Sequence, residues 1–541
     1  MRKILLTFLI FILVTESNSQ TPDLQWTALY SLDSINDVNE VLIDKNGSIF
    51  LTGHSYNSSI NFRAPFVRYS SAGELLFNAQ FSNSKTKGYG LAEHSSGLIF
   101  SSVYDDLYIK AYYFNTAWVT ASSTAFVSWD GRKNRSFIQI DNNDYIYIAG
   151  SLSSPGSPGM GFTSFTVTKM RPHSPFGIIF SKNYYSHNTP STEACKVFDF
   201  KLDSLGNYYL TGRNRLNSSQ QWGFTTIKCD SGGTMLWSDF YNGSAGNMDS
   251  AQSLAIDKSL NVIVAGNVTN TITGSDIVII KYDVDGNIIW ERVHDYQNGV
   301  DLLQDMSIDD NSNIIITGSR GIGESKDITT IMYDSLGNVI WERVYNGNAD
   351  KNDMPNEILL DKYNDIYVGG SSIEDTAHGS DFLILKYDIN GDLLWKLNYN
   401  DTVNNKDDLL KSMKFDKSRG MVLSGTSERA SGKVDIITMK YDNVVYVKNN
   451  SETITSFHLS QNYPNPFNPS TKIKFDIPKG SLVKLKIYDM LGREVAELVN
   501  DKLNPGTYEY EWNGVNLPSG VYFYKLESEN FIETKRMVLV K

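Results

Sequence analysis

Short apolar runs, four to a unit of about fifty residues, recur through the middle of the chain. Three segments show the pattern best: residues 281–293 (KYDVDGNIIWERV), 332–344 (MYDSLGNVIWERV) and 386–397 (KYDINGDLLWKL). Each carries a tryptophan near its end, and Trp237, Trp290, Trp341 and Trp395 lie 53, 51 and 54 residues apart. A near-constant spacing of this size is typical of a protein built from repeated structural units.

A second motif lies between the tryptophans. It consists of Asp, three residues, Asn and an apolar run that ends in glycine. The clearest copies end at Gly266, Gly318, Gly370 and Gly425, fainter copies end at Gly53, Gly150 and Gly212, and residues 98–102 stand where a further copy is expected. In the best unit the four runs cover residues 253–257, 261–266, 277–283 and 287–293, with tight turns at 257–260 and 283–286. Four short strands joined by such turns predict one blade of a β-propeller.

The number of blades follows from counting the apolar runs that end in glycine. Eight occur, near residues 50, 100, 148, 210, 264, 316, 368 and 423. The last unit lacks its tryptophan strand, whereas residues 24–30, which contain Trp26, supply one at the other end of the chain. Pairing of these two ends would remove the open edges of the array. We therefore expect an all-β protein with an eight-bladed β-propeller at 23–442. Seven blades remain the alternative because residues 90–126 match the repeat poorly.

The repeat resembles the SBBP-type repeats of bacterial β-propellers and, more loosely, the tryptophan-docking blades of quinoprotein-like propellers. The resemblance covers residues 23–442, rests on the motifs quoted above and is strongest from Phe198 onward. A large indole at one position per blade is expected to pack between neighbouring sheets, where it buries much apolar area. We expect no quinone or other cofactor.

The character of the chain changes after Asp442. Residues 443–457 are polar, as is typical of a linker between domains. Alternating strands with Gly and Pro turns then follow at 472–476, 482–488, 508–512, 520–526 and 535–540. They predict a small immunoglobulin-like β-sandwich at 458–541.

This last segment is similar to the type A C-terminal sorting domain of the type IX secretion system of Bacteroidetes-like bacteria. The matching pieces are NYPNPFNP (462–469), YDMLGREV (488–495), GTY (506–508), Trp512, LPSGVYFYKL (517–526) and the basic, apolar tail at 535–541. The candidate sorting-signal residues are Asn462, Tyr463, Pro464, Asn465, Pro466, Phe467, Gly492, Gly520 and Lys541. The resemblance implies recognition by the type IX machinery and export of the folded cargo. It also implies removal of the sorting domain within the linker, after which the propeller is released or anchored at the outer-membrane surface.

The first residues predict a secretory signal peptide at 1–19. Arg2 and Lys3 precede an apolar run at 4–14, and small residues suited to cleavage follow. Eleven helical residues span about 16 Å against a hydrocarbon core of about 30 Å, so we expect no membrane anchor here. No other apolar run is long enough for a transmembrane segment.

Composition limits the partners of this chain. The 541 residues carry a net charge of −12 and no cluster of Lys and Arg, so we expect no nucleic-acid binding. The aromatic content of 12% suits strands. Only two cysteines are present, Cys195 and Cys229, and the repeat places them on strands separated by a third. We expect stability to come from packing, with one disulfide as the alternative.

No motif for a catalytic nucleophile, a catalytic metal or a phosphate-binding loop occurs, and the seven histidines are scattered singly. The Asp-rich turn at 283–287 offers several oxygens, but it lacks the remaining ligands of a calcium loop. We therefore expect its carboxylates to close the turn, with structural calcium as the alternative. A catalytic metal is not expected.

Turns of a meander alternate between the two ends of each sheet, so the tight turns share one face and the longer polar loops share the other. Loops on one face of a rigid scaffold are a common place for binding. Two sets of aspartates recur at the ends of these loops: Asp249, Asp301, Asp353 and Asp408, and Asp276, Asp327, Asp381 and Asp435. Their periodicity favours capping of backbone amides or bridging between blades. An acidic, cation-binding rim is the alternative.

The leading hypothesis is a secreted or cell-surface propeller without a catalytic site that binds or displays an extracellular polymer or protein. The rival hypothesis is an extracellular polysaccharide lyase or glycoside hydrolase with its site in the propeller funnel. That site requires an asymmetric cluster of reactive groups, and Arg132, Arg135, Arg171 and His173 in the degenerate units are its candidates. A scaffold without a dedicated ligand is the third hypothesis.

Overall fold

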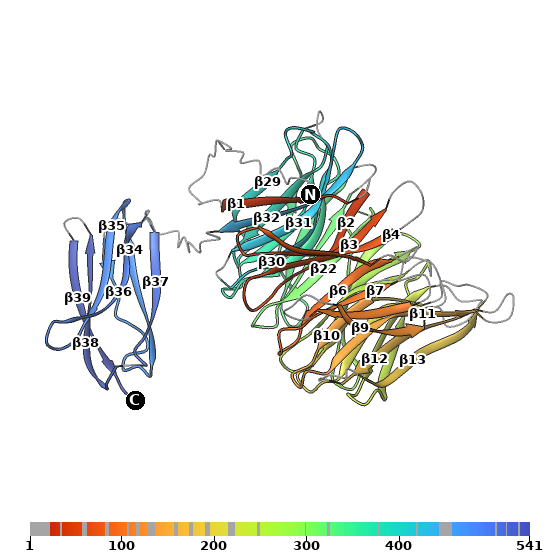
Figure 1. The fold of residues 1–541 in the computed structure, drawn as a ribbon, viewed down its shortest axis with the longest axis horizontal. Coiled ribbons are helices and arrows are strands. Elements are labelled where there is room, and N and C mark those ends of the chain that lie inside the picture. The colour runs from red at the N-terminus through yellow and green to blue at the C-terminus, as the bar shows by residue number, and fades with distance from the viewer. Residues whose placement is uncertain are drawn as a thin grey trace. The chain divides into compact units, whose positions relative to one another are not determined.

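The structure, a computed structural model, describes residues 22–541 except 33–34, 57–61, 82–85, 105–107, 115–119, 128–135, 156–160, 172–176, 190–194, 215–221, 246–248, 298, 322–324, 376–378, 418–419, 443–456, 504–505, 516 and 529–530. The expected signal peptide and, apart from Phe457, the expected linker lie outside the described residues. The described elements are all strands, which confirms the all-β prediction (Figure 1). The chain divides into two compact units between residues 444 and 445. No helix in the described part is long and apolar enough to cross a membrane.

The first unit consists of antiparallel sheets whose strands follow one another along the chain in groups of four. The first groups are β2 (Ile35–Ile43), β3 (Ile49–Tyr56), β4 (Phe62–Tyr69) and β5 (Leu75–Phe81); β6 (Lys87–Glu93), β7 (Ile99–Tyr104), β8 (Tyr108–Phe114) and β9 (Thr120–Val127); β10 (Ser136–Ile140), β11 (Ile146–Pro155), β12 (Gly161–Met170) and β13 (Ile178–Thr189); and β14 (Lys196–Leu202), β15 (Tyr208–Asn214), β16 (Gly223–Cys229) and β17 (Met235–Tyr241).

The later groups repeat this order. They are β18 (Ser250–Ile256), β19 (Val262–Asn270), β20 (Gly274–Tyr282) and β21 (Ile288–His294); β22 (Leu302–Ile308), β23 (Ile314–Arg320), β24 (Asp327–Tyr333) and β25 (Val339–Tyr345); and β26 (Met354–Leu360), β27 (Ile366–Ser372), β28 (Asp381–Tyr387) and β29 (Leu393–Tyr399). The last group contains β30 (Asp408–Phe415), β31 (Met421–Glu428) and β32 (Val434–Asp442), and β1 (Asp23–Tyr30) pairs with β32.

Burial follows the position of a strand in its sheet. The second and third strands, such as β19 and β20, are rich in Val and Ile and are buried along most of their length. The fourth strand, such as β21, keeps Trp290 buried but exposes most of its other side chains. Apolar side chains of neighbouring sheets share common cores: Ile263 and Ile279 of one sheet join Ile314 of the next. Burial of each such side chain contributes about 1.5–3 kcal/mol, so packing between sheets stabilises this unit.

The sheets are arranged around a closed circuit. The first strands contact one another in the order β2, β6, β10, β14, β18, β22, β26 and β30, and β30 contacts β2. Strand β1 completes the last sheet, with Trp26 opposite Lys440 and Thr27 opposite Met439. This pairing confirms the prediction that the N-terminal tryptophan strand joins the last unit. The circuit is therefore closed by two strands from opposite ends of the first unit, in the manner of a β-propeller.

Four of the repeated tryptophans join their own sheet to the next one. The indole Nε1 donates a hydrogen bond to a carbonyl in the tight turn between the third and fourth strands of the following sheet. These bonds are Trp26 to Ser71 (3.1 Å), Trp237 to Val284 (3.1 Å), Trp290 to Ser335 (3.2 Å) and Trp341 to Ile389 (3.0 Å). Trp395 is the exception, and its buried Nε1 has no hydrogen-bond partner within the described part of the chain. The sheet that follows Trp395 is the one closed by β32 and β1, where no turn joins the third and fourth strands.

The two cysteines are buried and form no disulfide with each other. Cys195 directly precedes β14 and Cys229 ends β16, and β15 lies between these strands. The prediction that a third strand separates them is confirmed. The first unit therefore gains no stability from a disulfide between them.

The second unit contains two antiparallel sheets. One has the order β33 (His458–Leu459), β34 (Ser470–Ile477) and β37 (Gly506–Asn513), and the other has the order β36 (Glu494–Leu503), β35 (Ser481–Tyr488), β38 (Gly520–Ser528) and β39 (Phe531–Leu539). A single core contains buried side chains from both sheets, among them Ile473, Trp512, Leu485 and Leu526. The two sheets therefore pack against each other on alternating inward-facing residues.

Candidate functional site

The tight turns are closed by aspartate carboxylates, as expected. Asp283 shows the pattern: its Oδ1 accepts hydrogen bonds from the backbone N–H groups of Asp285 (2.9 Å) and Asn287 (2.8 Å), and its Oδ2 accepts one from Asn287 Nδ2 (2.9 Å). The same bonds to Oδ1 recur at Asp44, Asp141, Asp203, Asp230, Asp257, Asp309, Asp334, Asp361 and Asp388. Local hydrogen bonds thus account for the acidic residues of the turn face.

The first set of loop aspartates lies where each long loop enters the first strand of the next sheet. All four side chains are buried. Each accepts a backbone N–H of its own loop through Oδ2: Asp249 from Gly243 (2.6 Å), Asp301 from Tyr296 (2.6 Å), Asp353 from Gly347 (2.6 Å) and Asp408 from Asp401 (2.7 Å). The donor always lies two residues beyond the preceding fourth strand. These carboxylates therefore make an equivalent hydrogen bond to the start of each of the four loops.

The second set lies at or near the start of the third strands β20, β24, β28 and β32. Backbone hydrogen bonds bring three of its members next to the first set, because the N–H of Asp301 donates to Ser275 (2.7 Å), that of Asp353 to Lys326 (2.7 Å) and that of Asp408 to Ser380 (2.6 Å). The carbonyls belong to the residues directly before Asp276, Asp327 and Asp381. The two sets thus meet in pairs at the junctions between sheets.

The fourth member of the second set, Asp435, has a different environment. Its carboxylate pairs with Arg429 at 2.9 Å and with Lys433 at 3.6 Å. The position equivalent to Asp408 in the next sheet is Asn36, whose Nδ2 donates to the carbonyl of Val434 at 2.8 Å. This junction therefore contains one aspartate with basic partners.

The pKa values of the paired aspartates differ from one junction to the next. At the junction of Asp381 and Asp408, burial and then the neighbouring Asp408 and Glu374 carboxylates raise the pKa of Asp381 to about 7. Burial also raises the pKa of Asp408 to about 6. For Asp327, burial raises the pKa, and the Arg320 guanidinium opposes that rise. Two buried carboxyls at one junction disfavour each other's ionisation.

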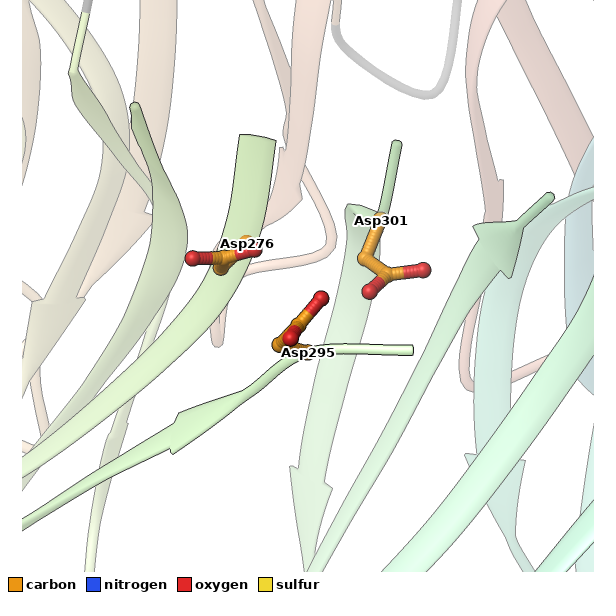
Figure 2. A group of neighbouring side chains, drawn as sticks. All are labelled: Asp276, Asp295 and Asp301. Atoms are coloured by element: carbon orange, nitrogen blue, oxygen red, sulfur yellow. The ribbon is translucent and has the colours of Figure 1, made fainter. Parts of the chain in front are cut away.

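At the junction of Asp276 and Asp301, Asp295 supplies a third carboxylate close to both. One oxygen each from Asp276, Asp295 and Asp301 lie within 4.8 Å of one another. Figure 2 shows the three side chains next to one another; Asp276 belongs to β20, Asp295 follows β21 and Asp301 precedes β22. Asp276 and Asp301 are buried, whereas Asp295 is exposed. This trio is the candidate metal centre of the described residues. Asp295 lies outside the two periodic sets, so its role did not show in the repeat pattern.

A second cluster of ionisable side chains lies on the first strands of the sheets, which form the inner circuit; its four acidic members are called the inner acids. Its members are Glu40 of β2, Asp199 and Lys201 of β14, Asp305 of β22, Glu357 of β26 and Lys414 of β30. The four acids directly follow a β-bulge in their strand. Sequence analysis missed these residues, although an acidic residue that recurs in the middle of several first strands is a usable signal. The candidates proposed from the degenerate units do not join them: Arg171 is exposed in the turn after β12, and Arg132, Arg135 and His173 lie outside the described residues.

Hydrogen bonds to the next sheet occupy these inner acids. Backbone N–H groups donate to them: Leu254 to Asp199 (2.9 Å), Ile358 to Asp305 (2.9 Å) and Met413 to Glu357 (2.6 Å). Lys414 adds ion pairs with Glu357 at 2.6 Å and with Glu40 at 3.7 Å. Burial raises the pKa of Asp305 to about 7, opposed by its backbone hydrogen bond from Ile358. The inner acids therefore join neighbouring sheets across the edges that the first strands leave unpaired.

In the second unit, the residues of the NYPNPF motif form a compact corner. Buried Asn462 donates through Nδ2 to the Pro464 carbonyl (3.1 Å) and Thr471 Oγ1 (2.9 Å), and its N–H donates to the Tyr524 hydroxyl (2.8 Å). The Tyr463-Pro464 and Asn465-Pro466 peptide bonds are cis. Tyr463 is 80% exposed, so its ring is available to a partner.

The other motif residues lie around the same unit. Asn465 Oδ1 accepts the Val538 N–H at 2.9 Å, and Phe467 packs on Trp512 with ring centroids 5.4 Å apart. Gly492 has φ +76 in a tight turn, and Gly520 begins β38. The N–H of Lys541 donates to Ser519 Oγ at 3.0 Å, and its Nζ donates to the Val515 carbonyl at 2.6 Å. Most of these motif residues thus serve packing and turn formation in this unit.

Comparison with known proteins identifies the second unit. Residues 461–541 match the family described as a secretion system C-terminal sorting domain. A sorting domain is therefore present, which implies secretion through the type IX system and display at the cell surface. No curated protein matches the chain.

Solved structures similar to the chain include three bacterial proteins. A protein of unknown function from Bacteroides caccae shares 9% identity over 55% of this chain and 95% of its own, with a TM-score of 0.31. PorZ, an essential surface component of the type IX secretion system of Porphyromonas gingivalis, shares 12% over 95% and 75%, with a TM-score of 0.30. A protein from Lactobacillus plantarum shares 11% over 64% and 95%, with a TM-score of 0.38.

Proposed function

We propose that this chain is a secreted or cell-surface β-propeller without a catalytic site, which presents its loop-rich face to an extracellular polymer or protein. The observation that carries the proposal is the sorting domain at 461–541, because such a domain addresses its cargo to the type IX machinery. The cargo is the unit formed by residues up to 444. We assign the sorting-signal role to the motif residues from Asn462 to Lys541 named above.

Finer features of the fold belong to this proposal. The closed circuit of first strands and the pairing of β1 with β32 support an eight-bladed propeller of SBBP type at 23–442. Two sheets on one core support an immunoglobulin-like sandwich at 458–541. We place the signal peptide at 1–19 and the processing site of the sorting domain in the linker at 443–457.

Two observations support display without catalysis. The loops carrying Asp249, Asp301, Asp353 and Asp408 have equivalent internal hydrogen bonds, so the loop face is presented by a rigid, repeating framework. The inner acids, which a funnel enzyme would use, accept backbone N–H groups of the next sheet. A carboxylate used in this way is a poor general base, because its lone pairs already bind donors.

The alternative function is an extracellular polysaccharide lyase or glycoside hydrolase. The inner cluster favours it, since paired carboxylates are the usual machinery of glycoside hydrolysis and the pKa of Asp305 near 7 suits a general acid. The two functions are separated by offering a glycan and polymer array and measuring binding and turnover together. Turnover that disappears in Asp305→Asn would establish the enzyme, whereas binding without turnover supports display.

Export is tested in a bacterium with a type IX system. The full chain, expressed with its own N-terminus, should become sensitive to protease added to intact cells. A variant lacking 458–541 should stay protected in the periplasm, and the full chain should stay protected when the secretion machinery is inactivated. Surface exposure of the truncated variant would refute the assigned role of the sorting domain.

A further inference from the structure

The junction between the sheet of β18–β21 and the sheet of β22–β25 concentrates three carboxylates. Asp276 comes from β20, Asp295 follows the end of β21, and Asp301 directly precedes β22. The 4.8 Å limit on the separation of their oxygens equals about twice a calcium–oxygen distance of 2.3–2.6 Å. Figure 2 shows Asp295 directed between the other two side chains. The geometry thus allows all three to contact one ion.

The hydrogen bonds of the two buried members leave oxygens unused. Asn270 Nδ2 donates to Asp276 Oδ2 at 2.6 Å, and the Thr273 hydroxyl donates to the same oxygen. Asp301 Oδ2 accepts the Tyr296 N–H. The Oδ1 atoms of Asp276 and Asp301 are buried without a hydrogen-bond partner, although both side chains are fully shielded from solvent. A buried carboxylate oxygen without a partner is costly unless a cation binds it.

Two basic side chains near the trio interact with Glu342, and one of them, His294, is also close enough to interact electrostatically with Asp301. Arg320 forms an ion pair with Glu342, and His294 Nε2 lies 3.8 Å from the same carboxylate. Of the residues that the structure describes, no cationic side chain forms an ion pair with Asp276 or Asp301. The junction therefore combines a negative charge with vacant ligand atoms.

Buried Oδ1 atoms without a hydrogen-bond partner also occur at Asp353, Asp381 and Asp408, so this junction differs from the equivalent ones only in a third position. Each loop begins directly after its fourth strand, at Asp295 in this loop and at Asn242, Asn346 and Asn400 in three others. These four positions are structurally equivalent, because in each loop the following residue donates its N–H to the loop aspartate. An asparagine at this position is thus compatible with the loop. Asp295 adds the third charge at this junction.

We propose that Asp276, Asp295 and Asp301 bind one Ca²⁺ ion, which joins the two sheets at the base of the loop face. A set of hard carboxylate oxygens suits Ca²⁺ or Mg²⁺, and Ca²⁺ is favoured because it accepts irregular geometry and ligands from flexible loops. Extracellular calcium modules have dissociation constants of about 10⁻⁴–10⁻³ M, which matches the place where an exported propeller works. The site holds one loop of the proposed display face in position.

The test compares the full chain with two single variants. Asp295→Asn removes the third charge and installs the residue of the equivalent loops. Asp285→Asn is the matched control, because Asp285 is exposed in a tight turn of the same sheet, on the opposite face. Equilibrium dialysis with CaCl₂ should give one ion per wild-type chain and per Asp285→Asn chain, and at least a tenfold weaker affinity for Asp295→Asn.

Thermal melting supplies a second measurement. With a dissociation constant near 1 mM, 10 mM Ca²⁺ favours the folded state about 11-fold over EDTA, which raises the Tm of wild type and the control by about 1–2 °C. Asp295→Asn should melt at least as high as wild type in EDTA, which shows that it folds, and should not respond to Ca²⁺. Equal Tm of wild type in EDTA and Ca²⁺, unchanged Ca²⁺ affinity in Asp295→Asn, or equal binding of Mg²⁺ would each overturn the proposal. These outcomes leave the export test unaffected.

Discussion

A glycine in the tight turns is required by the tryptophan of the preceding sheet, and Gly391→Ala tests this. Gly391 has φ +80, and a Cβ built on it would lie 2.7 Å from Cδ2 and 3.0 Å from Cγ of Trp341. Gly432 has a similar φ of +77 in another tight turn, but a Cβ there would meet no atom within 4 Å. Gly432→Ala therefore isolates the backbone cost of the same substitution.

The two costs follow from the geometry. Left-handed backbone disfavours Ala by about 1–2 kcal/mol, offset by about 0.4–1 kcal/mol from the stiffer unfolded chain, so Gly432→Ala should cost about 1 kcal/mol. Carbon atoms pack at about 3.5–4.0 Å, so in Gly391→Ala the turn and the indole must separate by about 1 Å. Trp341 is 94% buried and cannot simply swing outward. Overpacking and loss of its 3.0 Å bond to Ile389 add about 2 kcal/mol, for a total of about 3 kcal/mol.

Urea unfolding followed by tryptophan fluorescence measures both variants, since eight of the nine tryptophans lie before residue 443. A double-mutant cycle with Trp341→Ala completes the experiment, because removal of the indole should reduce the cost of Gly391→Ala to that of Gly432→Ala. Equal costs for the two glycine variants in the wild-type background would refute the proposed contact.

Three further predictions concern charge, closure and thiols. The pKa of Asp381 is about 7 in the folded protein against an ordinary 3.8, so the folded state holds a proton that the unfolded state loses, and stability falls as pH rises from 4 through 7. Asp381→Asn should remove up to about 4 kcal/mol of this loss at pH 8. An unchanged urea midpoint of the variant at pH 8 would contradict the prediction. Deletion of residues 22–30 opens the edge of β32; the resulting chain should oligomerise in light scattering, and a monomer of wild-type Tm would contradict the closing role. Both thiols are buried, and burial raises the pKa of Cys229 to about 11, so neither should react with a thiol reagent at pH 8 until denaturant is added. Rapid labelling of the native chain would contradict their burial.

The strands and the closure of the ring were predictable because their signals are local and repeated. Alternation and Asp-Gly turns depend on neighbours in the chain, so the runs expected at 253–257, 261–266, 277–283 and 287–293 match β18 to β21 within a few residues. The last unit lacks a tryptophan strand and the N-terminus supplies an extra one with Trp26, so the pairing of these two segments was predictable. In the second unit, β36 was missed because its sequence, EVAELVNDKL, does not alternate cleanly.

The candidate sites were less predictable because each combines residues from different sheets. The repeat identified the periodic aspartates, but their pairing across junctions depends on how one sheet docks on the next. The inner acids escaped because a β-bulge directs them toward the neighbouring first strand, and a bulge leaves little trace in a hydrophobic pattern.

By itself, the sequence predicted repeated four-stranded sheets in a ring and a C-terminal sorting domain, because the repeat period, the turn residues and the order of the motifs are local features of the chain. Only the tertiary structure decided which charges meet. Asp295 becomes a potential ligand because β20, β21 and the approach to β22 converge at one junction. A side chain at position 391 would meet Trp341, fifty residues earlier, because the indole lies against Gly391. Such contacts are set by the packing of one sheet on the next, which no single stretch of sequence contains.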